Sequence, residues 1–171
     1  MTGHASLEMA VASEDATTEA AKALGESLSA GDVVLLIGDL GAGKTHFAKG
    51  AIRGAGDDSE AMSPTFNIIL MHDGGRVPIA HMDLYRLDGA DQLEDIGFYE
   101  MVDESSGVAS LIEWADLFID EMPDDRLVVE ISRECLNGDR SGSSRAIRAE
   151  ATGERGRELL ARWRSALEPR S

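Results

Sequence analysis

The stretch Val33–Thr45, with the sequence VVLLIGDLGAGKT, decides the fold. Its first five residues form a continuous, branched apolar run, which is typical of a strand buried on both faces of a sheet. The pattern G-x-x-x-x-G-K-T follows at Gly38–Thr45, and a helical segment runs from Lys44 to about Arg53. In such a strand–turn–helix unit, backbone N–H groups and the helix start converge on a phosphate group. A glycine-rich turn with a chance Lys-Thr pair is the alternative, and the flanking strand and helix disfavour it.

The pattern assigns a role to each residue type in this phosphate-binding loop (P-loop). Glycines lack the β-carbon that would keep phosphate oxygens away from the backbone. We expect Lys44 to reach the β- and γ-phosphates and Thr45 to offer its hydroxyl to Mg²⁺. The expected phosphate cradle consists of Gly38, Asp39, Leu40, Gly41, Ala42, Gly43, Lys44 and Thr45.

Strands and helices alternate on both sides of the loop. Before it, we expect an edge strand at Leu7–Ala12 and a helix that is capped by Ser13 and ends near Leu28. This alternation predicts an α/β layered sheet, and the absence of a long linker predicts one domain over residues 1–171. After the loop we expect, in order, a connection Gly54–Glu60, a hairpin of Phe66–His72 and Arg76–Asp83, a helical segment Asp88–Glu104 broken at Gly97, a strand Val108–Ile112, a helix Trp114–Met122, strands Leu127–Ser132 and Arg145–Ala151, and a helix Glu154–Leu167.

Composition excludes several classes of protein. The 171 residues carry 32 acids against 16 bases, a net charge of −16, which argues against a protein that grips nucleic acid by itself. The longest strongly apolar run has five residues, whereas a bilayer span needs about 20, so no transmembrane helix is expected. The N-terminal segment does not resemble a secretory signal, and Cys135 is the only cysteine, so no intrachain disulfide is possible. Together these features predict a cytoplasmic protein.

Two acids follow predicted strands, as a magnesium-bound phosphate at the carboxyl ends of parallel strands requires. Asp83 follows Val77–Met82 at the end of the second hairpin strand, and Glu113 follows the strand that ends at Ile112. Either acid alone could instead be a turn or helix-terminal residue, but their shared placement indicates that at least one is functional. Arg86 could pair with Asp83 or with a γ-phosphate, and an ordinary surface ion pair is equally compatible.

Other residues have a structural and a functional interpretation. Thr65, in Ser63-Pro64-Thr65-Phe66, could belong to a switch-like loop near the γ-phosphate, although the residues alone favour a plain Ser-Pro turn. His81 is expected to be a strand residue rather than a metal ligand, because no second histidine is expected near it. Trp114 could stack on a base or a partner, or pack in the core. The cluster Arg155, Arg157, Arg162 and Arg164 could face a partner or RNA, or could pair with Glu154 and Glu158.

Taken together, the motifs GDLGAGKT, SPTF, HMDLYR and IEW, in this order, resemble the TsaE (YjeE) family of tRNA threonylcarbamoyladenosine (t6A) biosynthesis ATPases. The resemblance runs from about Ser13 to about Gly153. It implies a three-layer P-loop NTPase fold with a mostly parallel central sheet and antiparallel hairpin strands. It also implies ATP and Mg²⁺ on the loop, with Thr45 and Glu113 on the metal side. Asp83, Glu113, Lys44 and Thr65 would serve hydrolysis.

The resemblance also implies partners and a process. The family works with the TsaD and TsaB proteins, and its ATP turnover supports repeated transfer of the threonylcarbamoyl group to adenosine 37 of tRNAs that read ANN codons. The chain would therefore meet tRNA through the complex and would need no membrane. It departs from the family pattern at His72, in the loop Asn137–Ser144 and in the Arg-rich last helix.

The residues leave two other functions open. A small-molecule kinase would share the loop and the strand-end acid, with Arg155–Arg164 as its only lid candidate. A nucleotide-dependent interaction module would bind without appreciable turnover. A GTPase is disfavoured, because the guanine-reading Asn-Lys-x-Asp pattern needs a lysine and none follows Lys49.

Overall fold

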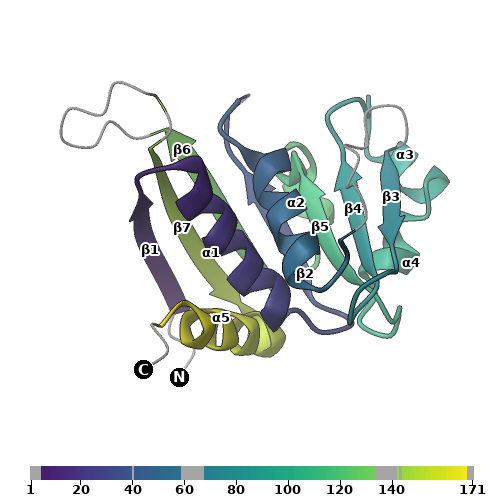
Figure 1. The fold of residues 1–171 in the computed structure, drawn as a ribbon. Coiled ribbons are helices and arrows are strands. Elements are labelled where there is room, and N and C mark those ends of the chain that lie inside the picture. Colours follow the sequence, from purple (N-terminus) through teal and green to yellow (C-terminus); the bar gives the residue numbers. More distant parts are fainter. Residues whose placement is uncertain (1–4, 40, 59–67, 134–141, 143, 169–171) are drawn as a thin grey trace.

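One seven-stranded sheet organises the molecule, with the strand order β1-β7-β6-β2-β5-β4-β3 (Figure 1). The structure is a computed structural model that describes residues 5–39, 41–58, 68–133, 142 and 144–168. None of the helices in these ranges combines the length and apolar character that a bilayer crossing needs. The strands are β1 (Ala5–Val11), β2 (Val33–Ile37), β3 (Ile69–His72), β4 (Ile79–Asp83), β5 (Ala109–Glu113), β6 (Arg126–Arg133) and β7 (Arg145–Thr152).

The sheet is parallel at its centre and antiparallel at its edges. β2 pairs in parallel with β5 and β6, and β4 pairs in parallel with β5. β3 pairs antiparallel with β4 at one edge, and β7 and β1 continue antiparallel from β6 at the other. The predicted mostly parallel sheet with antiparallel hairpin strands is confirmed. Because β2, β4 and β5 run parallel, their carboxyl ends lie at the same end of the sheet.

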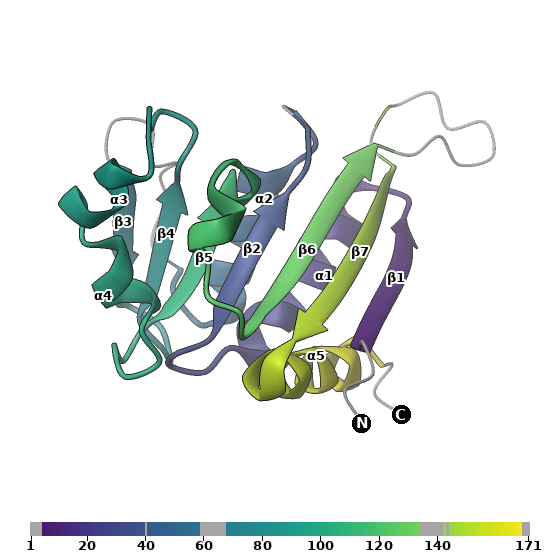
Figure 2. The same ribbon diagram turned by 180° about the vertical axis from the view of Figure 1, so that it is seen from behind.

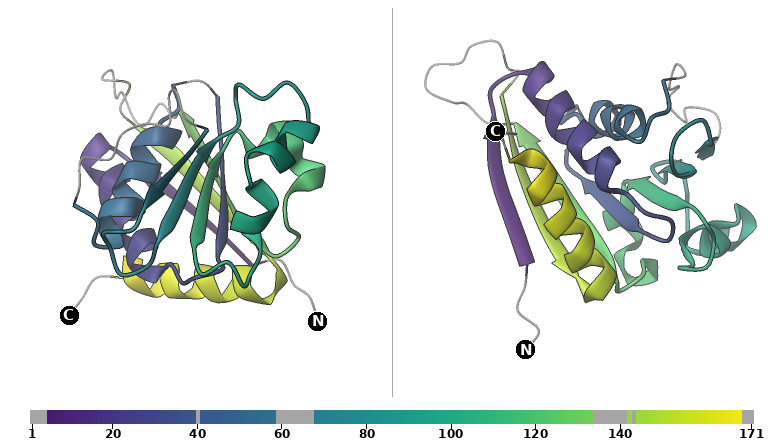
Figure 3. Two further views of the ribbon diagram at one scale, coloured as in Figure 1. Left: turned by 90° about the vertical axis from the view of Figure 1, so that its right-hand side faces the viewer. Right: turned by 60° about the horizontal axis from the view of Figure 1, so that its bottom comes forward.

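Helices cover both faces of the sheet, which makes three layers (Figures 2 and 3). In β2, Val34 and Leu36 belong to one apolar core, whereas Val33 and Leu35 belong to the other. Burial on both faces explains why this strand is continuously apolar instead of alternating. The first face carries α1 (Glu14–Ser27), α2 (Lys44–Gly54) and α5 (Gly153–Leu167), and the second carries α3 (Asp91–Asp95), α4 (Phe98–Val102) and the 3₁₀ helix η1 (Ala115–Glu121).

Helices α1 and α2 touch through glycines, which lets their backbones approach closely. A β-carbon on Gly25 would lie 1.9 Å from the carbonyl oxygen of Ala51. One on Gly54 would lie 2.1 Å from the carbonyl oxygen of Lys22. These separations are far below van der Waals contact, so α1 fixes the position of the helix that begins at the P-loop.

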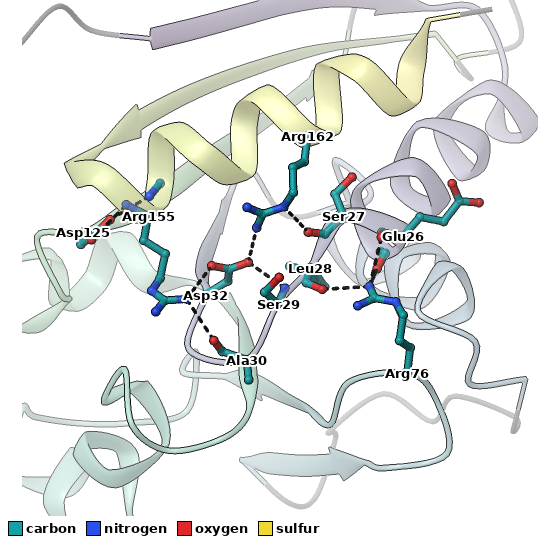
Figure 4. Close-up of polar contacts among 12 residues, drawn as sticks. Glu26, Ser27, Leu28, Ser29, Ala30, Asp32, Arg76, Asp125, Arg155 and Arg162 are labelled. Atoms are coloured by element: carbon teal, nitrogen blue, oxygen red, sulfur yellow. Dashed lines mark hydrogen bonds and ion pairs between the residues drawn. The ribbon is translucent and has the colours of Figure 1, made fainter. Parts of the chain in front are cut away.

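Two arginines of α5 hold together the end of the sheet at which β2 begins, opposite to the carboxyl ends of the parallel strands (Figure 4). Asp32, buried just before β2, accepts hydrogen bonds from the Ser29 N–H at 2.8 Å and from Arg162 at 3.0 Å. A terminal guanidinium nitrogen of Arg155 lies 3.5 Å from the other Asp32 oxygen and donates to the Ala30 carbonyl. The sequence predicts that these arginines either pair with Glu154 and Glu158 or face a partner or RNA. Arg155 and Arg162 instead contact Asp32 and backbone carbonyl groups. Burial raises the pKa of Asp32, while the Ser29 N–H and the arginines act against this rise.

Most predicted elements agree with the structure, and the differences are local. The predicted break at Gly97 is confirmed, since Gly97 has a φ of 81° and separates α3 from α4. The helix predicted over Trp114–Met122 is a 3₁₀ helix that begins at Ala115, because Trp114 itself is left-handed with a φ of 61°. The predicted connection Gly54–Glu60 begins inside α2, and Cys135 lies outside the described residues.

Candidate phosphate-binding site

The glycines of the loop after β2 meet steric and conformational demands that other residues cannot. Gly41 and Gly43 have φ values of 81° and 110°, in the left-handed region that favours glycine. A β-carbon on Gly38 would lie 2.4 Å from the Ile131 carbonyl oxygen, so the loop is pressed against β6. Gly43 is the N-cap of α2, and no side chain caps this helix, so its first N–H groups remain available to an anion.

Two arginines hold the outer side of the loop. Arg145, at the start of β7, donates from Nε to the Ala42 carbonyl at 2.7 Å. Arg133, at the end of β6, donates to the Gly41 carbonyl at 3.3 Å. Because a trans peptide directs its N–H away from its carbonyl, the Gly43 N–H points away from Arg145. The sequence interpretation missed both residues, since nothing in the local pattern indicates that these strand ends reach the loop.

Lys44 lies against the loop from which it starts. Its side chain is buried, with 5% of the residue exposed. The Nζ atom donates to the carbonyl oxygens of Gly38 and Asp39 and lies 3.9 Å from the centroid of the Trp114 ring. Burial lowers the pKa of Lys44, and Glu113 acts against this shift. The ammonium group of Lys44 therefore lies at the loop, where the phosphates of a bound nucleotide would lie.

Glu113 joins the loop to the neighbouring strand. Its Oε1 accepts a hydrogen bond from the Thr45 hydroxyl at 2.6 Å, and its Oε2 lies 2.6 Å from Nε2 of His81. Only 2% of Glu113 is exposed, and none of His81 is. The expectation that no second histidine lies near His81 is wrong, because the rings of His72 and His81 have centroids 6.3 Å apart.

Asp83 lies beside Glu113, since the two are register partners in the β4–β5 pair. Burial raises the pKa of Asp83, and the negative charge of Glu113 adds to this rise. The Tyr85 N–H, which donates to Asp83 at 3.0 Å, acts in the opposite direction. A carboxyl group with a raised pKa is suited to accept a proton during a reaction near neutral pH.

The predicted residues meet around one hollow of about 290 Å³. Its lining includes Lys44, Thr45, Asp83 and Glu113, together with the rings of Tyr85 and Trp114, whose centroids are 4.9 Å apart. Trp114 therefore faces the site rather than only the core. Arg86 is exposed, and Thr65 and Leu40 lie outside the described residues, so the structure does not place them.

These groups fit a metal-bound phosphate. Mg²⁺ prefers oxygen ligands and usually combines one or two carboxylates with oxygens of a bound phosphate. The Thr45 hydroxyl donates a hydrogen bond to Glu113, so the lone pairs of the Thr45 oxygen remain available to a cation. Within the described ranges no cluster of three His, Cys, Asp or Glu side chains could hold a metal by itself.

Comparisons with known proteins show which family the chain is similar to. The family model "Threonylcarbamoyl adenosine biosynthesis protein TsaE" matches residues 11–141. A Streptomyces coelicolor relative named tRNA threonylcarbamoyladenosine biosynthesis protein TsaE is 36% identical over 140 residues, which is 80% of this chain and 91% of the relative. The Bacillus subtilis protein of the same name is 46% identical over 103 residues, 60% of this chain. The chain spans less than two thirds of some of the relatives that it matches, namely 63% of the B. subtilis protein and 59% of one from Rickettsia conorii.

A solved structure shares the fold as a whole. The crystal structure of YdiB from Bacillus subtilis superposes with a TM-score of 0.75 at 30% sequence identity. The superposition covers 96% of this chain and 98% of the YdiB chain. The predicted P-loop NTPase type of α/β fold is therefore confirmed.

Proposed function

Because the chain belongs to the TsaE family of threonylcarbamoyl adenosine biosynthesis proteins, we propose that it is a slow, magnesium-dependent ATPase that supports t6A formation. It binds ATP on Gly38–Thr45, and its turnover drives repeated cycles of a TsaD–TsaB complex acting on position 37 of tRNAs that read ANN codons. The observation that carries this proposal is the Thr45–Glu113 hydrogen bond of 2.6 Å beside the buried Lys44. This pairing supports the proposal, because a Mg-ATP site of this type uses a hydroxyl, a carboxylate and an ammonium group close together.

Each residue has a distinct task in the proposed reaction. Lys44 exchanges its bonds to the Gly38 and Asp39 carbonyls for phosphate oxygens and neutralises their charge. Thr45 and Glu113 hold the magnesium side, and the ion, when bound, offsets negative charge on the β- and γ-phosphates. Asp83 accepts a proton from the attacking water, whose oxygen bonds to the γ-phosphorus as the bond from that phosphorus to the ADP oxygen breaks and ADP leaves. For Thr65 we propose the role that the family resemblance implies, namely participation in hydrolysis near the γ-phosphate.

The Arg-rich helix offers no support for a small-molecule kinase. Arg155 and Arg162 bind Asp32, which precedes β2, whereas the P-loop follows the other end of the same strand. A lid must reach the phosphates, whereas these two side chains bind Asp32 at the end of the sheet that lies away from the P-loop. An ATPase that acts on a protein complex needs no such lid.

Calorimetry and turnover measurements test the function. Mg-ATP should bind the isolated protein and be hydrolysed slowly, and a TsaD–TsaB complex with tRNA should stimulate hydrolysis. In a t6A assay the protein should convert a single round of modification into many. Absence of heat with Mg-ATP would exclude the proposal, and so would binding without any effect on repeated modification.

A Lys44→Ala variant tests the placement of the phosphates. We expect it to give no measurable heat with Mg-ATP, because the buried ammonium group at the loop is lost. Lys49→Ala, on the same helix but not lining the hollow, is the matched control and should bind like the wild type. Equal binding by both variants would contradict the proposed site.

A further inference from the structure

We propose that His81 is a positioning residue that orients Glu113 for the metal-bearing nucleotide, a role that rests on the proposed function. Its Nε2 atom lies 2.6 Å from Glu113 Oε2, while the other oxygen of the same carboxylate accepts from Thr45 at 2.6 Å. His81 therefore determines how the carboxylate is turned toward the P-loop without touching the nucleotide itself.

The sheet brings the two side chains together on one face. β4 and β5 are parallel neighbours in which His81 is the register partner of Leu111 and Asp83 that of Glu113. Side chains two residues apart on a strand share a face, so His81 and Glu113 face each other diagonally. Ile79 and Leu111 lie on this same face and belong to the core packed against α1 and α2.

The proton positions follow from the chemistry of the pair. An ionised carboxylate only accepts hydrogen bonds, so Nε2 of His81 carries the shared proton and Thr45 donates its own. Among the residues that the structure describes, Nδ1 of His81 is buried and has no hydrogen-bond partner, so the contact of Nε2 with Glu113 is the hydrogen bond that this ring forms there. With both carboxylate oxygens held, Glu113 can rotate only by breaking one of these bonds.

Packing alone does not account for a histidine at this position. The residue is fully buried, Ile79 and Leu111 on its face belong to an apolar core, and its Nδ1 atom finds no partner among the described residues. A buried polar atom without a partner costs free energy that an aliphatic residue would avoid. The hydrogen bond to Glu113 is the contact that an aliphatic residue could not replace. Partners of this kind orient metal-binding carboxylates and histidines in many proteins.

Three substitutions separate positioning from packing. His81→Gln keeps an N–H donor at the same bond distance from Cβ as Nε2, whereas His81→Asn carries the same amide one bond closer to the backbone. His81→Leu fills the space without a donor. His72→Leu is the matched control, because His72 is a buried histidine on β3 that forms no hydrogen bond with Glu113.

The main readout is the effect of Mg²⁺ on ATP affinity, measured by calorimetry with and without the ion. We expect the affinity gain from Mg²⁺ to fall about tenfold or more in the Leu and Asn variants, with kcat reduced similarly. Metal-free ATP binding should stay near the wild-type value, and His81→Gln should recover most of the gain. His72→Leu should match the wild type in the gain from Mg²⁺, and thermal unfolding verifies that each variant is folded.

The outcomes separate the inference from the function beneath it. If the wild type binds and hydrolyses Mg-ATP while folded Leu and Asn variants keep the full effect of Mg²⁺, the positioning role is wrong and the proposed function stands. Equal losses in Gln, Asn and Leu would also exclude it, since only packing would then matter. If the wild type shows no binding of Mg-ATP, the proposed function fails and the inference falls with it.

Discussion

Asp83 and Glu113 are neighbouring carboxylates in different surroundings, and the difference suits different tasks. Both oxygens of Glu113 contact donor groups, from Thr45 and His81. Asp83 is half-buried and accepts from the Tyr85 N–H, and burial raises its pKa. Groups with environments this unlike commonly divide binding and proton transfer between them.

Replacing Asp83 should separate stability from activity. A raised folded-state pKa means that ionisation costs the folded state free energy, so wild-type stability falls as pH rises from the ordinary value of 3.8 through the raised pKa. Asp83→Asn carries no such cost and keeps an oxygen for the Tyr85 N–H. We expect its melting temperature at pH 7 to equal or exceed that of the wild type, and the advantage to vanish below pH 3.8.

The same variant should lose hydrolysis by about 100-fold, because the proton acceptor is gone. Mg-ATP binding, measured by calorimetry, should change by no more than about threefold, since Lys44, Thr45 and Glu113 remain. Asp88→Asn, an exposed acid outside the hollow, is the control for the loss of one charge. A variant that binds weakly yet hydrolyses normally would reverse this assignment.

At the scale of elements, the P-loop depends on a strand far away in the sequence. Arg145 of β7 bonds to the Ala42 carbonyl at 2.7 Å and also to the Gly142 and Ser144 carbonyls at 2.6 and 2.9 Å. A charged donor on a loop carbonyl restricts the conformations that the loop samples before a ligand arrives. Preorganisation of this kind increases affinity without any contact to the ligand.

Arg145→Ala should therefore weaken Mg-ATP binding by about tenfold, which corresponds to a hydrogen bond from a charged group. Calorimetry measures the loss, and thermal unfolding shows whether β7 stays in place. Arg148→Ala is the matched control, because Arg148 lies three residues along the same strand and forms an exposed pair with Glu8 at 2.9 Å. Unchanged affinity in the folded Arg145 variant would show that the loop holds its shape alone.

Local patterns predicted the elements better than they predicted the contacts between them. The apolar run at β2, the Ser13 cap and the Gly97 break depend on nearby residues, and each agrees with the structure. Spacing could not distinguish a 3₁₀ helix from an α-helix after Trp114, because both place apolar residues three apart. Arg145 and His81 escaped prediction because their partners lie 103 and 32 residues away.

At the scale of the molecule, charge is unevenly distributed along the chain. The segment Leu87–Asp125 contains thirteen acids and no lysine or arginine. It supplies α3, α4 and η1, the layer on one face of the sheet. A phosphate backbone meets repulsion there, which favours proteins over nucleic acid as direct partners.

The isolated protein should consequently fail to retain tRNA. In filter-binding experiments at about 0.15 M salt we expect no saturable binding at micromolar protein, because the net charge of −16 opposes association. Addition of the TsaD–TsaB complex should bring the protein and tRNA into one assembly. Submicromolar binding of tRNA by the protein alone would contradict the inference from charge.

The glycine contacts between α1 and α2 restrict how the molecule can respond to a ligand. Carbonyl oxygens occupy the places where side chains at Gly25 and Gly54 would lie, so neither helix can slide or roll along the other without a backbone collision. The two helices therefore form a rigid pair beneath the P-loop. Free energy released by an anion arriving at the start of α2 is therefore not dissipated in shifting that helix, and any shape change that signals occupancy must come from the segments around the hollow.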